Sequence, residues 1–315
     1  MSSPLVSICI PCHNAERYVG AALDSALAQT WPNMEIVVVD DGSTDGSGEI
    51  LAYYERPGVK ILSQVNRGQC AAANLAFREC SGDYIKFFDA DDLLSPDFIT
   101  KQMARLDGRT DAVASAEWGR FYDDDLSGFK QTPQSVWRDM EATDWLVEAW
   151  ADARPMMQCA LWMIPRQVLE RSGGWDESLS LDNDFEFFAR VLCQSDEVLF
   201  TTGATLYYRS GVAGSLSGQT NRKAVESAYH SLLKGTGQLL DRRNDHAAKR
   251  SCANVIQNFI YTYYPSHKDL IYQMKRRVRE LGGSDLEPEG PPKYQFLRQW
   301  TGWRLAKRIQ RLAGR

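Results

Sequence analysis

The chain has 315 residues, 43% of them hydrophobic and 24% charged, which is the composition of a folded globular protein with a sizeable core. Its formal net charge is −5, with 36 Lys and Arg against 41 Asp and Glu, so nothing suggests nucleic acid as a partner. The charge is uneven, because Lys293 to Arg315 contain seven basic residues and no acidic one. The cysteines are odd in number, seven, and are scattered along the sequence.

The sequence shows no signal peptide, which would be a basic segment followed by an apolar one, and no apolar run of about 18 residues. We therefore expect reduced thiols in a cytoplasmic protein that lacks a membrane span.

Strand and helix patterns alternate in the N-terminal part of the chain. Apolar runs typical of strands lie at 5–11, 35–39, 59–63 and 84–88, and helical spacing appears between them, with Asn14 as a candidate cap of the first helix. This alternation predicts a mostly parallel sheet with right-handed crossovers. Polar clusters follow three of the strands, at 11–14, 40–43 and 89–92. Because parallel strands end at one edge of a sheet, we expect the three clusters to form one site.

The last cluster holds three carboxylates, Asp89, Asp91 and Asp92, directly after an apolar and aromatic run. Clustered carboxylates raise one another's pKa unless a cation lies between them. Mg²⁺ and Mn²⁺ prefer oxygen ligands and commonly keep a diphosphate in their coordination shell. The cluster therefore favours a metal–diphosphate anchor, and the alternative is an acidic turn before the helix start at Ser95.

The remaining chain is less regular. We predict strands within 111–122, 197–201 and 205–209, a polar loop over 123–135, and helices at 141–151, 165–172, 221–241, 246–262 and 267–281. A linker follows at 288–292.

Six ordered motifs resemble the family 2 inverting glycosyltransferases: VSICIPCHNAERYV (6–19), EIVVVDDGSTDGS (35–47), NRGQCAAAN (66–74), GDYIKFFDADD (82–92), GGWDE (173–177) and NDFEFFAR (183–190). The resemblance implies a GT-A fold, an α/β architecture with a mostly parallel central sheet flanked by helices. On this basis 1–215 form the GT-A domain, with a nucleotide-binding half (1–105) and an acceptor-binding half (106–215). A helical extension (216–287) and a linker with a basic tail (288–315) complete the chain.

The resemblance also implies roles for single residues. His13 stands where a ring stacks on the base, Asp41 where a carboxylate accepts the base's imide N–H, and Gly68 where the backbone approaches the ligand. The nucleotide-binding residues implied in this way are Pro11, His13, Asn14, Glu16, Asp41, Asn66, Gly68, Asn74, Asp89 and Ala90. The alternative for His13 is an ordinary loop histidine.

For the reaction itself, the resemblance makes Asp91 the ligand of Mg²⁺ or Mn²⁺ and Asp184 the general base that deprotonates the acceptor hydroxyl. Asn183 replaces the glutamate that is customary before this base. Trp175 and Asp176 are expected beside the donor or acceptor sugar. The alternative for Asp184 is a carboxylate that only stabilises a helix N-terminus.

The function implied is the metal-dependent transfer of a sugar, with inversion, from a nucleotide diphosphate sugar (UDP-sugar favoured) to a hydroxyl of a glycan or lipid-linked glycan, as in polysaccharide biosynthesis. One alternative is a sugar nucleotidyltransferase, although the loop from Cys12 to Glu16 has neither the glycine nor the lysine that would hold a triphosphate. Another is a catalytically silent nucleotide-sugar-binding protein, which Asn183 and the lack of a histidine soon after Arg209 favour.

The tail from residue 293 reads as a basic amphipathic helix with tryptophans at 300 and 303. Such a helix favours peripheral contact with an anionic membrane, here the inner face of the plasma membrane. The alternatives are a helix docked on the acidic body of the protein and a dimer contact.

Overall fold

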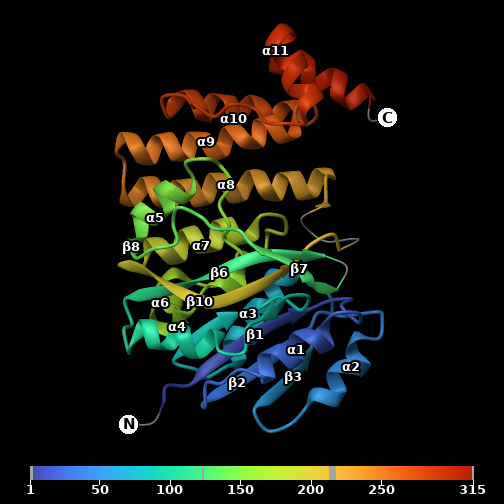
Figure 1. The fold of residues 1–315 in the computed structure, drawn as a ribbon, viewed down its shortest axis with the longest axis vertical. Coiled ribbons are helices and arrows are strands. Elements are labelled where there is room, and N and C mark those ends of the chain that lie inside the picture. The colour runs from blue at the N-terminus through green and yellow to red at the C-terminus, as the bar shows by residue number, and fades with distance from the viewer. Residues whose placement is uncertain (1–2, 123, 213–217, 314–315) are drawn as a thin grey trace.

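The computed structural model describes residues 3–122, 124–212 and 218–313, which form two sheets at the N-terminal end and a stack of helices at the C-terminal end (Figure 1). The first sheet has the strand order β3-β2-β1-β4-β9. Its strands are β1 (Val6–Cys12), β2 (Met34–Asp40), β3 (Val59–Ser63), β4 (Tyr84–Phe87) and β9 (Ile164–Pro165). All neighbours pair in parallel except β9, which is antiparallel to β4. The predicted parallel pairing of the first four strands is confirmed, and β1 is buried at its centre because helices cover the sheet.

Helices α1 (Val19–Leu27), α2 (Ser47–Tyr54) and α3 (Gln69–Glu79) connect these strands. The prediction that Asn14 caps the first helix is wrong, because α1 begins five residues later. Asn14 instead has a left-handed backbone with φ 49°, and its side-chain oxygen accepts hydrogen bonds from Thr44. The polar loop after β1 is thereby tied to the loop after β2.

The second sheet has the order β5-β10-β6-β7, with β8 paired to β10. Its strands are β5 (Leu93–Leu94), β6 (Ala112–Tyr122), β7 (Asp125–Gln131), β8 (Met140–Glu141) and β10 (Glu197–Arg209). Two predictions about the segments that form this sheet are wrong. The predicted loop 123–135 contains the exposed edge strand β7, whose polar side chains hid it from the apolar pattern. The two strands expected at 197–209 are one, with a register shift between Thr201 and Thr205.

The remaining helices are α4 (Phe98–Leu106), α5 (Ala142–Ala149), α6 (Arg166–Ser172), α7 (Asn183–Cys193), α8 (Arg222–Arg242), α9 (His246–Tyr263), α10 (Lys268–Glu280) and α11 (Pro292–Ala313), with a short 3-10 turn at Cys159–Leu161. In Figure 1, α8, α9 and α10 lie in a stack above α7, with α11 beyond them. Gly302, with φ 74°, kinks α11. Within the described ranges, no helix combines the length and apolar character that crossing a membrane requires.

Candidate active site

A cavity of about 1540 Å³ opens where the first sheet ends and α7 begins. Ten of the residues predicted for the site line it: Pro11, His13, Asn14, Asn66, Asp41, Gly68, Asp89, Ala90, Asp91 and Asp184. They come from the end of β1, from the loops after β1, β2, β3 and β4, and from the first turn of α7. The fold therefore brings the three polar clusters and the candidate base to one space.

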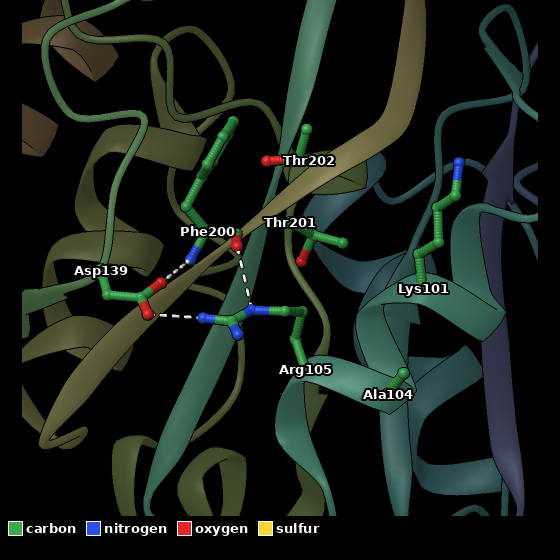
Figure 2. A pocket seen from close by; sticks show the side chains of 7 residues that line it. All are labelled: Lys101, Ala104, Arg105, Asp139, Phe200, Thr201 and Thr202. Atoms are coloured by element: carbon green, nitrogen blue, oxygen red, sulfur yellow. Dashed lines mark hydrogen bonds and ion pairs between the residues drawn. The ribbon is translucent and has the colours of Figure 1, made fainter.

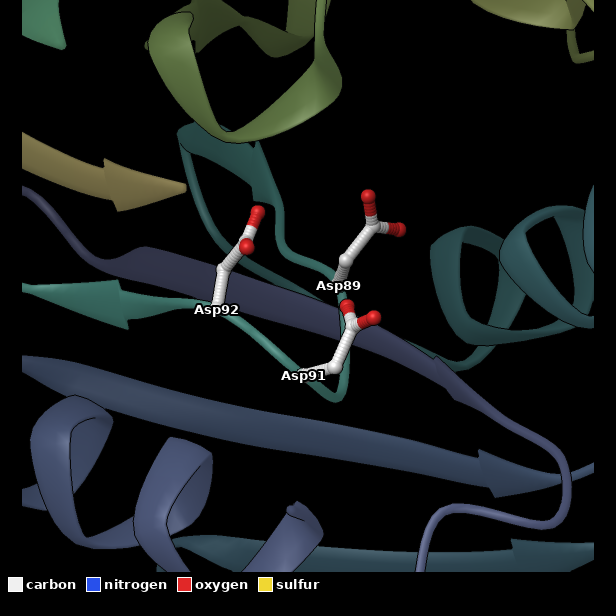
Figure 3. A group of neighbouring side chains, drawn as sticks. All are labelled: Asp89, Asp91 and Asp92. Carbon is white, nitrogen blue, oxygen red and sulfur yellow. The ribbon is translucent and has the colours of Figure 1, made fainter. Parts of the chain in front are cut away.

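Figure 3 shows the three carboxyl groups on the loop that follows β4. One oxygen from each of Asp89, Asp91 and Asp92 lies within 4.8 Å of the others. Two glutamine amides occupy part of this cluster: Gln158 donates to Asp89 at 2.9 Å and to Asp92 at 2.8 Å, and Gln69 donates to Asp89 at 2.8 Å. The backbone N–H of Arg209 fills another position on Asp92 at 2.7 Å. Among the described residues, no neighbouring side chain hydrogen-bonds to the Asp91 carboxylate.

This difference makes Asp91 the carboxylate most open to a cation. Burial, and next the charge of Asp89, raise the pKa of Asp91 to about 7. Burial also raises the pKa of Asp89 and of Asp92. A divalent cation would offset the repulsion within this cluster, and oxygen is the donor atom that Mg²⁺ and Mn²⁺ prefer. The residues present therefore fit such an ion.

Asp184 lies in the first turn of α7 and faces the same cavity. Burial raises the pKa of its carboxyl well above the ordinary value, and the charges of Asp89 and Asp182 raise it further. Asn183 links this turn to the carboxylate cluster, because its amide donates to Gln69 at 3.2 Å and Gln69 donates to Asp89. The asparagine in place of glutamate is thus a neutral member of a hydrogen-bonded chain between the two acidic sites.

Asp41 is 2% exposed and holds the loop that precedes α3. Its carboxylate accepts hydrogen bonds from the backbone N–H groups of Arg67 and Gly68, both at 2.8 Å, and from the Gln64 amide at 2.7 Å. Gly68 has φ 94°, a conformation that suits glycine. This arrangement fixes the cavity wall beside Asp41.

His13 is exposed at the mouth of the same wall. Its ring lies 3.1 Å from the Asn66 amide and 3.2 Å from the Asn14 amide, measured at Nε2. These contacts hold the imidazole between two loops.

The family assignment follows from a comparison of sequences. The model of the family described as glycosyl transferase family 2 matches residues 7–173, which is more than half of the chain. The protein belongs to glycosyl transferase family 2. The chain is 45% identical over 98 residues to chondroitin synthase of Escherichia coli, covering 30% of this chain and 14% of that protein. It is 33% identical over 141 residues to the putative teichuronic acid biosynthesis glycosyltransferase TuaG of Bacillus subtilis, covering 43% and 56%. The matched segments thus span from about a seventh to just over half of these relatives.

Solved structures show the same GT-A fold. S. aureus TarS 1-349 superposes with a TM-score of 0.67 at 18% identity, covering 99% of this chain and 92% of that one. A TarS structure in complex with UDP has a TM-score of 0.68 at 16% identity, covering 98% and 91%. The mannosyltransferase PcManGT from Pyrobaculum calidifontis, in complex with GDP-Man and Mn²⁺, gives 0.58 at 16% identity, covering 99% and 88%.

Four of the predicted site residues lie outside the cavity lining: Glu16, Asn74, Trp175 and Asp176. Asn74 clamps the GGWDE segment by bonding both backbone groups of Trp175, at 2.7 and 2.9 Å. The Trp175 ring is buried and stacks on Phe187 with centroids 3.8 Å apart. Asp176 pairs with Lys234 of α8, and Glu16 accepts from the Gly46 N–H at 2.7 Å. Each of the four is thus held by contacts with other groups of the protein.

Gln158 and the cavity face of α9 were missed by the sequence analysis. Gln158 follows a segment without helical or strand periodicity, and a lone glutamine carries no motif. The residues of α9 that line the cavity are Val255, Asn258, Phe259, Thr262 and Tyr263. Their helical spacing was visible, but it predicts a packed face equally well.

A smaller depression of about 490 Å³ lies between α4 and β10, at the register shift of β10. Figure 2 shows Arg105 bridging Asp139 and the carbonyl of Phe200 there. Because its one acidic side chain is already paired with this arginine, the depression offers no free carboxylate for catalysis or metal binding.

Proposed function

We propose that this glycosyltransferase moves a sugar from a nucleoside diphosphate sugar, with UDP as the favoured nucleotide, to an acceptor hydroxyl with inversion of configuration. The observation that carries the proposal is one cavity lined by both Asp91 and Asp184, which come from segments about ninety residues apart in the sequence. A single displacement needs leaving-group stabilisation on one side of the sugar and a proton acceptor on the other.

Each residue has a distinct part in this proposal. Asp91, with Asp89 beside it, would hold the divalent cation, which supplies charge neutralisation for the departing diphosphate. Asp184 accepts the proton of the incoming hydroxyl. Its raised pKa makes this carboxylate a stronger base than an ordinary aspartate. His13 and Asp41 border the space for the base, and Gly68 allows close approach of the backbone. Two solved structures with a similar fold hold a nucleotide, UDP in TarS and GDP-Man with Mn²⁺ in PcManGT, which supports a nucleotide sugar as the donor.

The two alternatives lose support for specific reasons. A nucleotidyltransferase needs a triphosphate-binding loop, whereas the loop from Cys12 to Glu16 is occupied by contacts to the 43–46 segment. Asn183 does not support the alternative of a catalytically silent binding protein, because this asparagine still connects α7 to Asp89 through Gln69.

Hydrolysis of the donor in water tests the proposal. Nucleotide sugars are first screened with Mn²⁺ by thermal shift, since a ligand at one hundred times its dissociation constant stabilises by about 2.7 kcal/mol. With the donor that binds best, Asp184→Asn is expected to leave the dissociation constant for that donor unchanged. It should lower the turnover of donor hydrolysis by about 10²- to 10⁴-fold, the usual contribution of a general base. Normal turnover in Asp184→Asn would contradict the assigned role.

We also propose that α11 contacts an anionic membrane surface. After the kink at Gly302, this helix packs on the body, with Ala306 fully buried and the Trp303 ring centroid 4.9 Å from that of Tyr261. Before the kink, Phe296 is 65% and Trp300 78% exposed, in a helix whose charges are all basic. Exposed aromatic side chains beside cations are typical of helices that lie at a lipid interface.

Sedimentation with vesicles of phosphatidylcholine, with or without phosphatidylglycerol, tests this contact. The double variant Phe296→Ser and Trp300→Ser is expected to lose most of its binding to the anionic vesicles. The control is Tyr53→Ser with Tyr272→Ser, which removes two exposed rings elsewhere, 86% and 66% exposed. Equal pelleting of the two double variants would exclude α11 as the contact.

A further inference from the structure

The cavity is larger than a donor alone requires. Binding sites for small molecules usually have volumes of about 300–1,000 Å³. The cavity of the glycosyltransferase has about 1540 Å³, and the residues proposed to bind the donor line only its sheet side. The remainder, beyond Asp184, therefore has room for a second ligand.

One face of α9 forms the wall of this remaining space. Val255, Asn258, Phe259, Thr262 and Tyr263 recur at intervals of three and four residues, so they lie on the same side of the helix. These residues lie outside the segment that the family model matches, which ends at residue 173. The helical extension thus contributes directly to the cavity that contains Asp184.

The side chains on this face suit a sugar. The Tyr263 ring is half-buried beside Phe259, with centroids 4.6 Å apart, and such rings pack against the C–H faces of pyranoses. Among the described residues, the hydroxyls of Thr262 and Tyr263 have no hydrogen-bond partner. Asn258 donates to the carbonyl of Ala153 at 3.1 Å, which joins α9 to the 151–155 segment beside it in the cavity wall. A few polar groups on an apolar wall are what a small-molecule site uses to orient its ligand.

The charges of this part of the cavity limit the class of sugar. Of the two arginines that line the cavity, Arg154 is paired with Glu289. The other, Arg120, lies on β6, where its guanidinium donates to Ser210 and stacks over the Tyr208 ring. Asp152, Asp182 and Asp184 also line the cavity, and among the described residues no Lys or Arg pairs with them. A carboxylate or sulfate on the bound sugar would be repelled here.

We infer that α9 forms the acceptor site, which binds an uncharged saccharide with one sugar at Asp184 and the next against Thr262 and Tyr263. The inference rests on the proposed function for its identification as an acceptor site. Burial, and next the charge of Asp182, raise the pKa of Tyr263 to about 12, so its hydroxyl stays protonated and donates to a sugar oxygen.

Saturation-transfer NMR tests the site by binding rather than by activity. The probes are lactose and chitobiose as uncharged disaccharides, and a hyaluronan disaccharide as an anionic one, each added to the full chain with UDP and Mn²⁺. We expect signal transfer to at least one uncharged probe and none to the anionic probe. Transfer to the anionic disaccharide alone, or to none of the probes at millimolar concentration, would overturn the inference.

Thr262→Trp supplies the site-specific variant, because Thr262 is exposed on α9 and a larger side chain there fills the cavity. It is expected to weaken disaccharide binding at least tenfold while UDP binding, measured by calorimetry on the same sample, stays unchanged. Ala247→Trp, at an exposed position of α9 away from the cavity, is the matched control. Equal disaccharide binding by both variants would overturn the inference. If the unmodified protein does not bind UDP, that result would instead contradict the proposed function, independently of the disaccharide binding.

Discussion

The two walls of the cavity are held in different ways. On the wall that we propose binds the donor (the donor wall), the loops after β1, β2 and β3 hold one another. The Asp41 side chain accepts hydrogen bonds from the 64–68 segment, and the Asn14 side chain accepts them from Thr44. On the opposite wall, helices from the C-terminal extension hold the segment that leads to Asp184. Ser227 of α8 accepts from Ser180 and donates to the Leu181 carbonyl, and Ser231 donates to the carbonyl of Asp182 at 2.5 Å. Changes in the first wall should therefore affect donor binding, and changes in α8 should affect turnover.

The largest expected effect is on the donor side. Asp91→Ala removes the open carboxylate of the metal cluster, so the dissociation constant for UDP with Mn²⁺ should rise more than about 100-fold. Calorimetry with and without Mn²⁺ measures this, and the exposed carboxylate of Glu170 on α6 gives the control Glu170→Ala. Unchanged Mn²⁺-dependent binding in Asp91→Ala would remove the metal site from the account.

A smaller effect, on Mn²⁺ affinity, is expected for Gln158, which contacts the carboxylate cluster from the middle of the sequence. Gln158→Leu leaves Asp89 and Asp92 without their shared amide donor, which should weaken Mn²⁺ binding about 10- to 100-fold, the usual range for groups that orient metal ligands. Mn²⁺ titration followed by electron paramagnetic resonance measures it. Gln238→Leu, at a half-buried position of α8 outside the cavity lining, is the control. Equal Mn²⁺ affinity in the two variants would show that Gln158 is only a packing residue.

The opposite wall is tested by the double variant Ser227→Ala and Ser231→Ala. Each lost hydrogen bond is worth about 1 kcal/mol, and a looser turn before Asp184 should lower donor hydrolysis about tenfold with the affinity for UDP unchanged. Ser251→Ala removes a buried hydroxyl that bonds only within α9 and should leave both quantities unchanged. A shift in UDP affinity instead of turnover would mean that the two walls are not separable.

The smallest effect concerns Asp176. Burial acts to raise its pKa, but hydrogen bonds from Lys234 and Ser178 lower it to about 2. Because the ordinary pKa of Asp is about 3.9, the ionised group stabilises the fold above that pH, and this contribution is lost as the pH falls towards 2. Asp176→Asn should cost at most about 1 kcal/mol at pH 7 and less at pH 3, measured by urea unfolding. A loss of turnover at unchanged stability would restore the predicted sugar contact.

The same contrast explains what the sequence could predict. The donor wall consists of strand ends, and polar residues such as Asp41 and Asp89 after apolar runs are readable without knowledge of the fold. The opposite wall depends on tertiary contacts. Nothing local shows that Gln158 reaches Asp89, that Ser231 bonds Asp182, or that the face of α9 borders a cavity rather than a core. Trp175 was placed by resemblance beside a sugar, whereas its stacking on Phe187 buries it behind the site.

The stereochemistry of the product tests most directly whether Asp184 acts as a base opposite a metal-held diphosphate. Proton NMR during hydrolysis of the preferred nucleotide sugar identifies the first anomer released, before mutarotation mixes the two forms. We predict the anomer opposite to that of the donor, because a hydroxyl activated by Asp184 attacks the face away from the diphosphate. Release of the donor's own anomer first would require another mechanism and would contradict the account.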